Sequence, residues 1–92
     1  LGPGGHVVNI ARGSCVDTAA LAAALRAGRL AGAALDVYES EPRPPQELLG
    51  LDNVILTPHV AGWSPQAIRA TVENFIANVE AWRRGEPLPT PI

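Results

Sequence analysis

Charged and ionisable side chains follow three separate apolar segments of the chain. Arg12 comes after HVVNIA, the carboxylates of Asp36, Glu39 and Glu41 come at or after the end of LAGAALDV, and His59 comes after VILTP. An arginine guanidinium can hold a carboxylate through two parallel hydrogen bonds, and a histidine can give or take a proton near neutral pH. A nearby carboxylate favours the protonated imidazolium. The set suits a small 2-oxo or 2-hydroxy acid, and because no amino acid supplies a hydride, a nicotinamide cofactor is implied.

Each of these residues also has a structural interpretation. Arg12 could be a surface arginine near a helix start, Asp36 a loop residue bonded to its own backbone, and His59 a structural histidine. Glu39 and Glu41 could be solvated carboxylates in a charged turn. If the three apolar segments are parallel strands, however, their carboxyl ends lie on one edge of the sheet, where open α/β sheets bind ligands. This shared position favours the chemical interpretation.

The elements that would position these side chains can be read from the apolar patterns. Short apolar segments bounded by glycine, proline or polar residues predict strands over 6–11, 33–37 and 54–57. The proline-rich segment between the last two strands predicts a loop with one helical turn at 46–49. Continuous apolar strands linked by crossovers indicate an α/β fold with a parallel sheet. Three strands and two helices make half of such a sheet.

Two helices are predicted. The first covers 18–27, capped by Asp17 or Thr18 and ended by Gly28. The second begins after Ser64, with proline at its first position, and ends at Gly85. Apolar residues recur along one face of this long helix, and we expect them, Trp82 included, to pack: Ile68, Val72, Phe75, Ile76, Val79 and Trp82.

Other candidate sites are weaker. The two histidines, His6 and His59, stand in different contexts and do not predict a zinc site, so no metal is expected. The GPGG segment at 2–5 precedes a strand and lacks the spacing of a dinucleotide fingerprint. Cys15 has no thiolate-activating pattern and is expected to pack. Trp63 adjoins the His59 segment, so that it could line a pocket.

Composition excludes several classes of protein. The 92 residues allow one small domain, and an apolar content of 47% argues against disorder. A net charge of −2 without a basic tract makes nucleic acid and membrane unlikely partners. A single cysteine fits a reducing compartment, and we expect a cytoplasmic protein. The chain has no methionine and begins with the loop-like LGPGG; loss of an initiator methionine could explain this, but we favour a piece of a longer protein.

Three motifs carry a resemblance to a known family. VNIARGSCVDTAALAAAL, GAALDVYESEP and LDNVILTPHVAG resemble, in order, the C-terminal motifs of the D-isomer-specific 2-hydroxyacid dehydrogenases. Members include D-lactate dehydrogenase, phosphoglycerate dehydrogenase and glyoxylate/hydroxypyruvate reductase. The resemblance implies an NAD(P)-dependent oxidoreductase acting on the CH–OH group of D-2-hydroxy acids. It also implies that 1–63 is the C-terminal half of a Rossmann domain, and that 64–92 is a helix and tail returning to the substrate domain.

The resemblance assigns roles to individual residues. Arg12 would bind the substrate carboxylate and carbonyl, His59 would be the general acid/base, and Glu41, not Glu39, would be its partner. Asp36 would contact the nicotinamide carboxamide. The backbone lining the nicotinamide side of the pocket would come from Ile10, Ala11, Arg12, His59, Val60, Ala61 and Gly62.

Some family features lie outside the motifs found here. The glycine fingerprint, the residue that selects NAD or NADP and most of the substrate domain lie upstream in the family, and Trp63 is a local departure. The alternative is a non-catalytic, nucleotide-sensing interaction protein resembling the C-terminal-binding-protein corepressors. We expect the complete protein to be a homodimer, and the 92-residue piece to be inactive alone and to self-associate through its exposed strand edge and helix faces.

Overall fold

The computed structural model describes residues 1–91, which form two compact units. The first unit is Leu1–Ala61 and contains a sheet, and the second begins at Gly62 and contains a long helix. Within the described residues, neither helix has the length and apolarity needed to cross a membrane.

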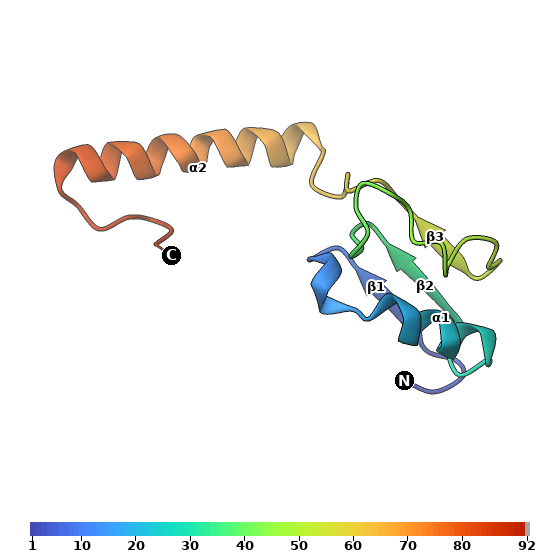
Figure 1. Ribbon diagram of the computed structural model, residues 1–92. Coiled ribbons are helices and arrows are strands. Elements are labelled where there is room, and N and C mark those ends of the chain that lie inside the picture. The colour runs from blue at the N-terminus through green and yellow to red at the C-terminus, as the bar shows by residue number, and fades with distance from the viewer. Residues whose placement is uncertain (92) are drawn as a thin grey trace. The chain divides into compact units, whose positions relative to one another are not determined.

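The first unit is built on a three-stranded parallel sheet, as predicted. Strands β1 (His6–Asn9), β2 (Gly32–Leu35) and β3 (Val54–Leu56) lie side by side in that order (Figure 1). Asn9 pairs with Leu35, and Leu35 pairs with Leu56. The three strands therefore end level with one another, and the loops that follow them start from one edge of the sheet.

The strands end earlier than the apolar patterns suggest. They stop at Asn9, Leu35 and Leu56, whereas the predicted ends were residues 11, 37 and 57. The backbone ladder still reaches one residue further, because the Asp36 amide donates to the Asn9 carbonyl at 2.9 Å and the Thr57 amide to the Leu35 carbonyl at 3.0 Å. Beyond that point the chain turns, and the side chains of Asn9 and Asp36 bond the turning backbone.

Helix α1 (Thr18–Arg26) lies along one face of the sheet (Figure 1). Asp17 caps it, because its carboxylate accepts a hydrogen bond from the Ala20 amide at 2.9 Å. The core between α1 and the sheet is made of apolar side chains from both elements and from the following loop: Leu21, Ala22, Leu25, Ala33, Leu35, Tyr38 and Leu48. These apolar contacts hold α1 and the loop after β2 against the sheet.

The opposite face of the sheet is open in the first unit. Strand side chains alternate, so Val7 packs against the core while Val8 points away and is 68% exposed. Ile55 on β3 is likewise 66% exposed.

A short 3-10 helix, η1 (Gly13–Cys15), precedes α1. Its last residue, Cys15, is exposed, so the prediction that Cys15 packs is wrong.

The loop from β2 to β3 forms turns in place of the predicted helical turn at 46–49. The Leu48 amide donates to the Pro45 carbonyl at 3.1 Å, and the Leu51 amide donates to the Leu48 carbonyl at 3.3 Å. Leu48 is only 1% exposed, so the loop contributes one of the largest buried side chains of the core. Burial of one leucine fixes this loop without a helix.

The second unit consists of α2 (Pro65–Arg84) and a C-terminal tail. The Ser64 hydroxyl caps α2 by accepting from the Ala67 amide at 3.0 Å, and Gly85 ends it in the left-handed conformation, as predicted. Asn78 donates to the Thr90 hydroxyl at 2.8 Å and thereby holds the tail. The apolar face is exposed, Trp82 by 73%, so packing of Trp82 is not seen in this unit.

Candidate active site

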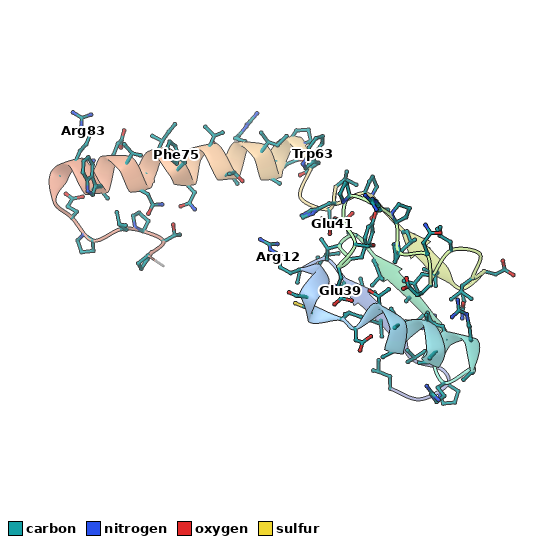
Figure 2. The ribbon with its side chains drawn as sticks, in the orientation of Figure 1. Arg12, Glu39, Glu41, Trp63, Phe75 and Arg83 are labelled. Carbon is teal, nitrogen blue, oxygen red and sulfur yellow. The ribbon has the colours of Figure 1, made fainter. Side chains whose placement is uncertain are left out.

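The candidate site lies where the three strands end. Arg12, Asp36 and His59 follow the carboxyl ends of β1, β2 and β3 respectively, and Glu39 and Glu41 belong to the loop after β2. Figure 2 shows Arg12, Glu39 and Glu41 at one end of the first unit. A cavity of about 460 Å³ is lined by residues of all three loops: Arg12, Gly13, Ser14, Val37, Tyr38, Glu39, Glu41 and His59.

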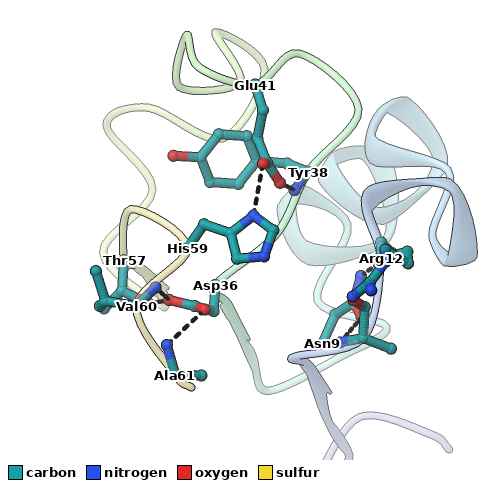
Figure 3. A network of polar contacts seen from close by, with 10 residues as sticks. Asn9, Arg12, Asp36, Tyr38, Glu41, Thr57, His59, Val60 and Ala61 are labelled. Carbon is teal, nitrogen blue, oxygen red and sulfur yellow. Dashed lines mark hydrogen bonds and ion pairs between the residues drawn. The ribbon is translucent and has the colours of Figure 1, made fainter. Parts of the chain in front are cut away.

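His59 and Glu41 form a hydrogen-bonded pair. The His59 Nδ1 atom lies 2.8 Å from Glu41 Oε2, and because a carboxylate can only accept, Nδ1 carries the proton (Figure 3). The Tyr38 amide donates to Glu41 Oε1 at 2.8 Å, which fixes the other carboxylate oxygen. The hydrogen bonds from His59 and from Tyr38 hold the pKa of Glu41 below its usual value. Glu41 is therefore charged at neutral pH and orients the imidazole.

His59 has an unusual backbone conformation. Its φ is +56°, in the left-handed region that residues other than glycine rarely adopt. Its amide donates to the Asp36 carbonyl at 2.9 Å, and the two following amides are bonded as well. A strained conformation persists only when its surroundings fix it, and here the fixing residue is Asp36.

Asp36 binds the loop that carries His59. Its carboxylate accepts hydrogen bonds from the Thr57 hydroxyl, from the Val60 amide at 2.9 Å and from the Ala61 amide at 2.8 Å (Figure 3). Asp36 is 5% exposed, and these donors, Thr57 foremost, hold its pKa below the usual value. Because the pKa of Asp36 is lowered in the folded protein, its ionised carboxylate stabilises the fold. This stabilisation is fully present above the usual pKa of a carboxyl group and is lost as the pH falls through the lowered pKa.

Thr57 is the residue of this loop that sequence reasoning missed. A threonine directly before a proline predicts only the end of a strand, and nothing in the sequence spacing links it to Asp36, 21 residues earlier. The available signal was the position of both residues just past neighbouring strands, where a short hydroxyl side chain can reach a buried carboxylate.

Arg12 lies on the far side of the same cavity. Its Nη1 atom donates to the Ala11 carbonyl at 2.6 Å, the one side-chain hydrogen bond that Arg12 makes within residues 1–91. A guanidinium has five N–H donors, so most of them are available to a ligand in the cavity. Glu39 lines the cavity as well, but its Oε2 accepts from the Thr18 amide at 3.3 Å at the start of α1, away from His59.

Gly13 brings the Arg12 loop against the Glu41 loop. A Cβ atom at this position would lie 2.3 Å from the Tyr38 carbonyl carbon and 2.7 Å from the Glu39 amide nitrogen. No real side chain tolerates such distances to backbone atoms, so only glycine permits the approach. The glycine after Arg12 therefore sets the width of the cavity.

We expect Gly13→Ala to destabilise the protein by about 1–3 kcal/mol, because overpacking against backbone forces the two loops apart. Thermal unfolding of the complete protein measures this, and activity should fall with it. Gly4→Ala is the matched control, since a Cβ there meets nothing within 4 Å. Equal melting temperatures for the two variants would contradict the close approach at Gly13.

Four of the predicted cofactor residues lie within two residues of Arg12 or His59 along the chain and are exposed. Ile10 is 67% exposed and Val60 is 38% exposed, and Ala11 and Ala61 are exposed too. Exposed apolar side chains next to charged ones fit a nicotinamide ring, which has apolar faces and a polar carboxamide edge. Ala61 is the last residue of the first unit, and Gly62 and the 80% exposed Trp63 begin the second, so the roles of Gly62 and Trp63 stay predictions.

The site offers side chains for acid–base chemistry. Across residues 1–91 no three His, Cys, Asp or Glu side chains are grouped closely enough to hold a metal ion. What the cavity does hold is a histidine oriented by a carboxylate and, opposite to it, an arginine with free donors. This arrangement can bind a small carboxylate and protonate or deprotonate an oxygen atom of it.

Comparisons with known proteins agree with this geometry. The family model described as D-isomer specific 2-hydroxyacid dehydrogenase, NAD binding domain, matches residues 1–61, the same residues that form the first compact unit. Hydroxyphenylpyruvate reductase of Plectranthus scutellarioides is 46% identical over all 92 residues, and glyoxylate reductase of Pyrococcus furiosus is 50% identical over 88 residues, 96% of the chain. The chain spans 29% and 26% of the lengths of these two relatives.

A solved structure has the same fold. The NADPH-dependent glyoxylate/hydroxypyruvate reductase of Sinorhizobium meliloti, in complex with NADP and malonate, superposes with a TM-score of 0.85 at 45% identity. The match covers 99% of this chain and 28% of that one. Because the family model matches about two thirds of the residues and the fold agrees, the chain belongs to the D-isomer specific 2-hydroxyacid dehydrogenase family.

Proposed function

We propose that the complete protein is an NAD(P)-dependent dehydrogenase that reduces small 2-oxo acids to D-2-hydroxy acids. The observation that carries this proposal is the His59–Glu41 pair, 2.8 Å apart, in one cavity with Arg12. The relatives named above are reductases of glyoxylate, hydroxypyruvate or hydroxyphenylpyruvate, all of which are 2-oxo acids.

Arg12 and His59 divide the work on the substrate. The Arg12 guanidinium binds the substrate carboxylate and polarises the neighbouring carbonyl. His59, protonated on both nitrogens, donates the Nε2 proton to the carbonyl oxygen while a hydride reaches the carbonyl carbon. The product is the 2-hydroxy acid, and His59 remains as neutral imidazole that keeps its Nδ1 proton, hydrogen-bonded to Glu41. Glu41 keeps its hydrogen bond to Nδ1 throughout and so fixes the orientation of the ring.

The reduced cofactor, NADH or NADPH, would supply the hydride and would leave as NAD or NADP. Within the first unit, the backbone that would hold the ring belongs to the segments 10–12 and 59–61. Asp36 was predicted to contact the carboxamide; its carboxylate already bonds the 57–61 loop, so we propose that it serves the cofactor site by holding that loop. The S. meliloti relative binds NADP, which supports the same class of cofactor here.

We expect Glu41→Gln to lower kcat for reduction. Glutamine keeps the shape of the side chain but not its charge, so the hydrogen bond that orients the His59 imidazole becomes weaker. Steady-state kinetics with a 2-oxo acid measure the effect. Glu39→Gln is the control, because Glu39 bonds the Thr18 amide and not His59, and it should keep the wild-type kcat. A wild-type kcat in Glu41→Gln would show that Glu41 does not act on His59.

The proposal is tested by assaying the complete protein with NADH and NADPH on glyoxylate, hydroxypyruvate and pyruvate. Turnover on at least one acid is expected, with a D-configured product where the product is chiral. Nucleotide-dependent association without turnover would instead support the corepressor-like alternative. We expect the active form to be a cytoplasmic homodimer, and the 92-residue piece alone to be inactive, because the family's pyrophosphate-binding glycines are not among its motifs.

A further inference from the structure

Asn9 occupies the position from which the Arg12 loop leaves the sheet. It is the last residue of β1 and is 5% exposed. Both ends of its side-chain amide bond the backbone of the loop. Oδ1 accepts from the Ala11 amide at 3.1 Å. Nδ2 donates to the Arg12 carbonyl at 2.9 Å, and Figure 3 shows Asn9 beside Arg12. The loop is therefore folded around one buried amide group.

Few side chains could replace this amide. Holding Ala11 and Arg12 together requires an acceptor and a donor on the same short side chain, which asparagine alone provides at this length. Aspartate keeps the acceptor but would turn a negative oxygen toward the Arg12 carbonyl. Alanine would leave both backbone groups without their partner beside the buried strand end, at a cost in free energy.

The amide acts on Arg12 through the backbone alone. The Arg12 side chain donates to the Ala11 carbonyl, whereas Asn9 donates to the Arg12 carbonyl, which also accepts from the Cys15 amide at 3.1 Å. Gly13, the residue after Arg12, lies against the Tyr38 carbonyl. The Arg12 side chain is long and exposed, so its aim depends on where these contacts fix its backbone.

We propose that Asn9 is the positioning residue for Arg12, holding the guanidinium where it meets the carboxylate of a 2-oxo acid. This inference rests on the proposed function, in which Arg12 binds that carboxylate. It parallels the other side of the cavity, where the buried Asp36 holds the His59 loop through side-chain bonds to backbone amides. Each of the two reacting side chains thus has its own buried polar anchor at a strand end.

Asn9→Ala in the complete protein is expected to lower kcat/KM by about 100-fold, because a displacement of about 1 Å of a substrate-positioning group costs that much. Most of the loss should be in KM for the oxo acid. The affinity for the reduced dinucleotide, measured by fluorescence titration, should change far less. An effect confined to thermal stability would overturn the proposal.

A double-mutant cycle separates positioning from a general structural role. If Asn9 acts through Arg12, then Asn9→Ala should add little to the loss already caused by Arg12→Ala. A fully additive loss would overturn the proposal. Asn53→Ala is the matched control: its amide also bonds a backbone carbonyl, that of Ala31 at 3.2 Å, but in the turn before β3, at the opposite end of the sheet, and it should leave KM unchanged.

Asn9→Asp serves the same cycle if Asn9→Ala does not fold, since it keeps the side-chain shape and the Ala11 bond. It should raise KM as Asn9→Ala does, and a wild-type KM would overturn the role of the Arg12 bond. Binding of oxamate, an unreactive analogue of a 2-oxo acid, gives a readout without turnover. Wild type that binds oxamate but turns nothing over would refute the proposed function alone, whereas equal oxamate affinities in wild type and Asn9→Ala would refute the positioning role.

Discussion

His59→Ala is expected to lower turnover of the complete protein by about 100- to 10,000-fold, the usual contribution of one general acid. The reason is that His59 is the one ionisable side chain of the cavity that can deliver a proton near neutral pH while a carboxylate, Glu41, orients it at 2.8 Å. Dinucleotide binding should be nearly intact, because the ring is removed but the loop remains bonded to Asp36. Single-turnover and steady-state rates of oxo-acid reduction measure the effect.

The control for this variant is His6→Ala. His6 is the chain's other histidine and stands at the start of β1, at the opposite end of the sheet from the cavity. Its replacement should leave turnover within the scatter of wild type. Near-wild-type turnover in His59→Ala would remove His59 from the chemistry and, with it, the assignment of Glu41 as its partner.

Arg12→Ala is expected to lower kcat/KM by about 100- to 1,000-fold, which is the usual cost of removing one preorganised donor to a developing oxyanion. The variant loses both the fork that holds the substrate carboxylate and the charge that polarises the carbonyl. Arg12→Lys should recover part of kcat/KM, since an ammonium restores the charge but not the two parallel hydrogen bonds.

Arg29→Ala provides the comparison for Arg12. Arg29 is exposed and precedes β2, so it lies near the amino end of the strands. Steady-state kinetics with a 2-oxo acid and with its alcohol or aldehyde analogue would show whether discrimination for the carboxylate is lost. If Arg12→Ala retained the preference for the acid, the carboxylate would have to be bound elsewhere.

Sequence patterns predicted the sheet and the helices because those depend on local information. The caps at Asp17 and Ser64 and the glycine at position 85 follow from short-range chemistry, and the structure has all of them in place. The α/β class and the parallel sheet follow from apolar strands separated by crossovers. The family motifs then suggested which side chain of each loop would face the cavity.

What could not be predicted depends on contacts between distant segments. The bonds from Asp36 to Thr57, Val60 and Ala61 span 21 to 25 residues, and the strands end early because such bonds redirect the chain. Gly13 is required by the backbone of Tyr38, which no local pattern of the Arg12 segment reveals. The helical turn predicted at 46–49 is not formed, and the buried Leu48 holds that loop through contacts with distant segments. These are properties of the assembled fold.

The left-handed backbone at His59 has a consequence for mutational libraries. At φ +56°, glycine and asparagine fit the main chain without strain, whereas valine, isoleucine and threonine fit it worst. A saturation library at this position would therefore be filtered twice, once by main-chain geometry and once by proton transfer. Glycine and asparagine both pass the first filter and fail the second. Asparagine, unlike glycine, does not add backbone freedom, which makes it the cleaner reporter of what the imidazole itself contributes.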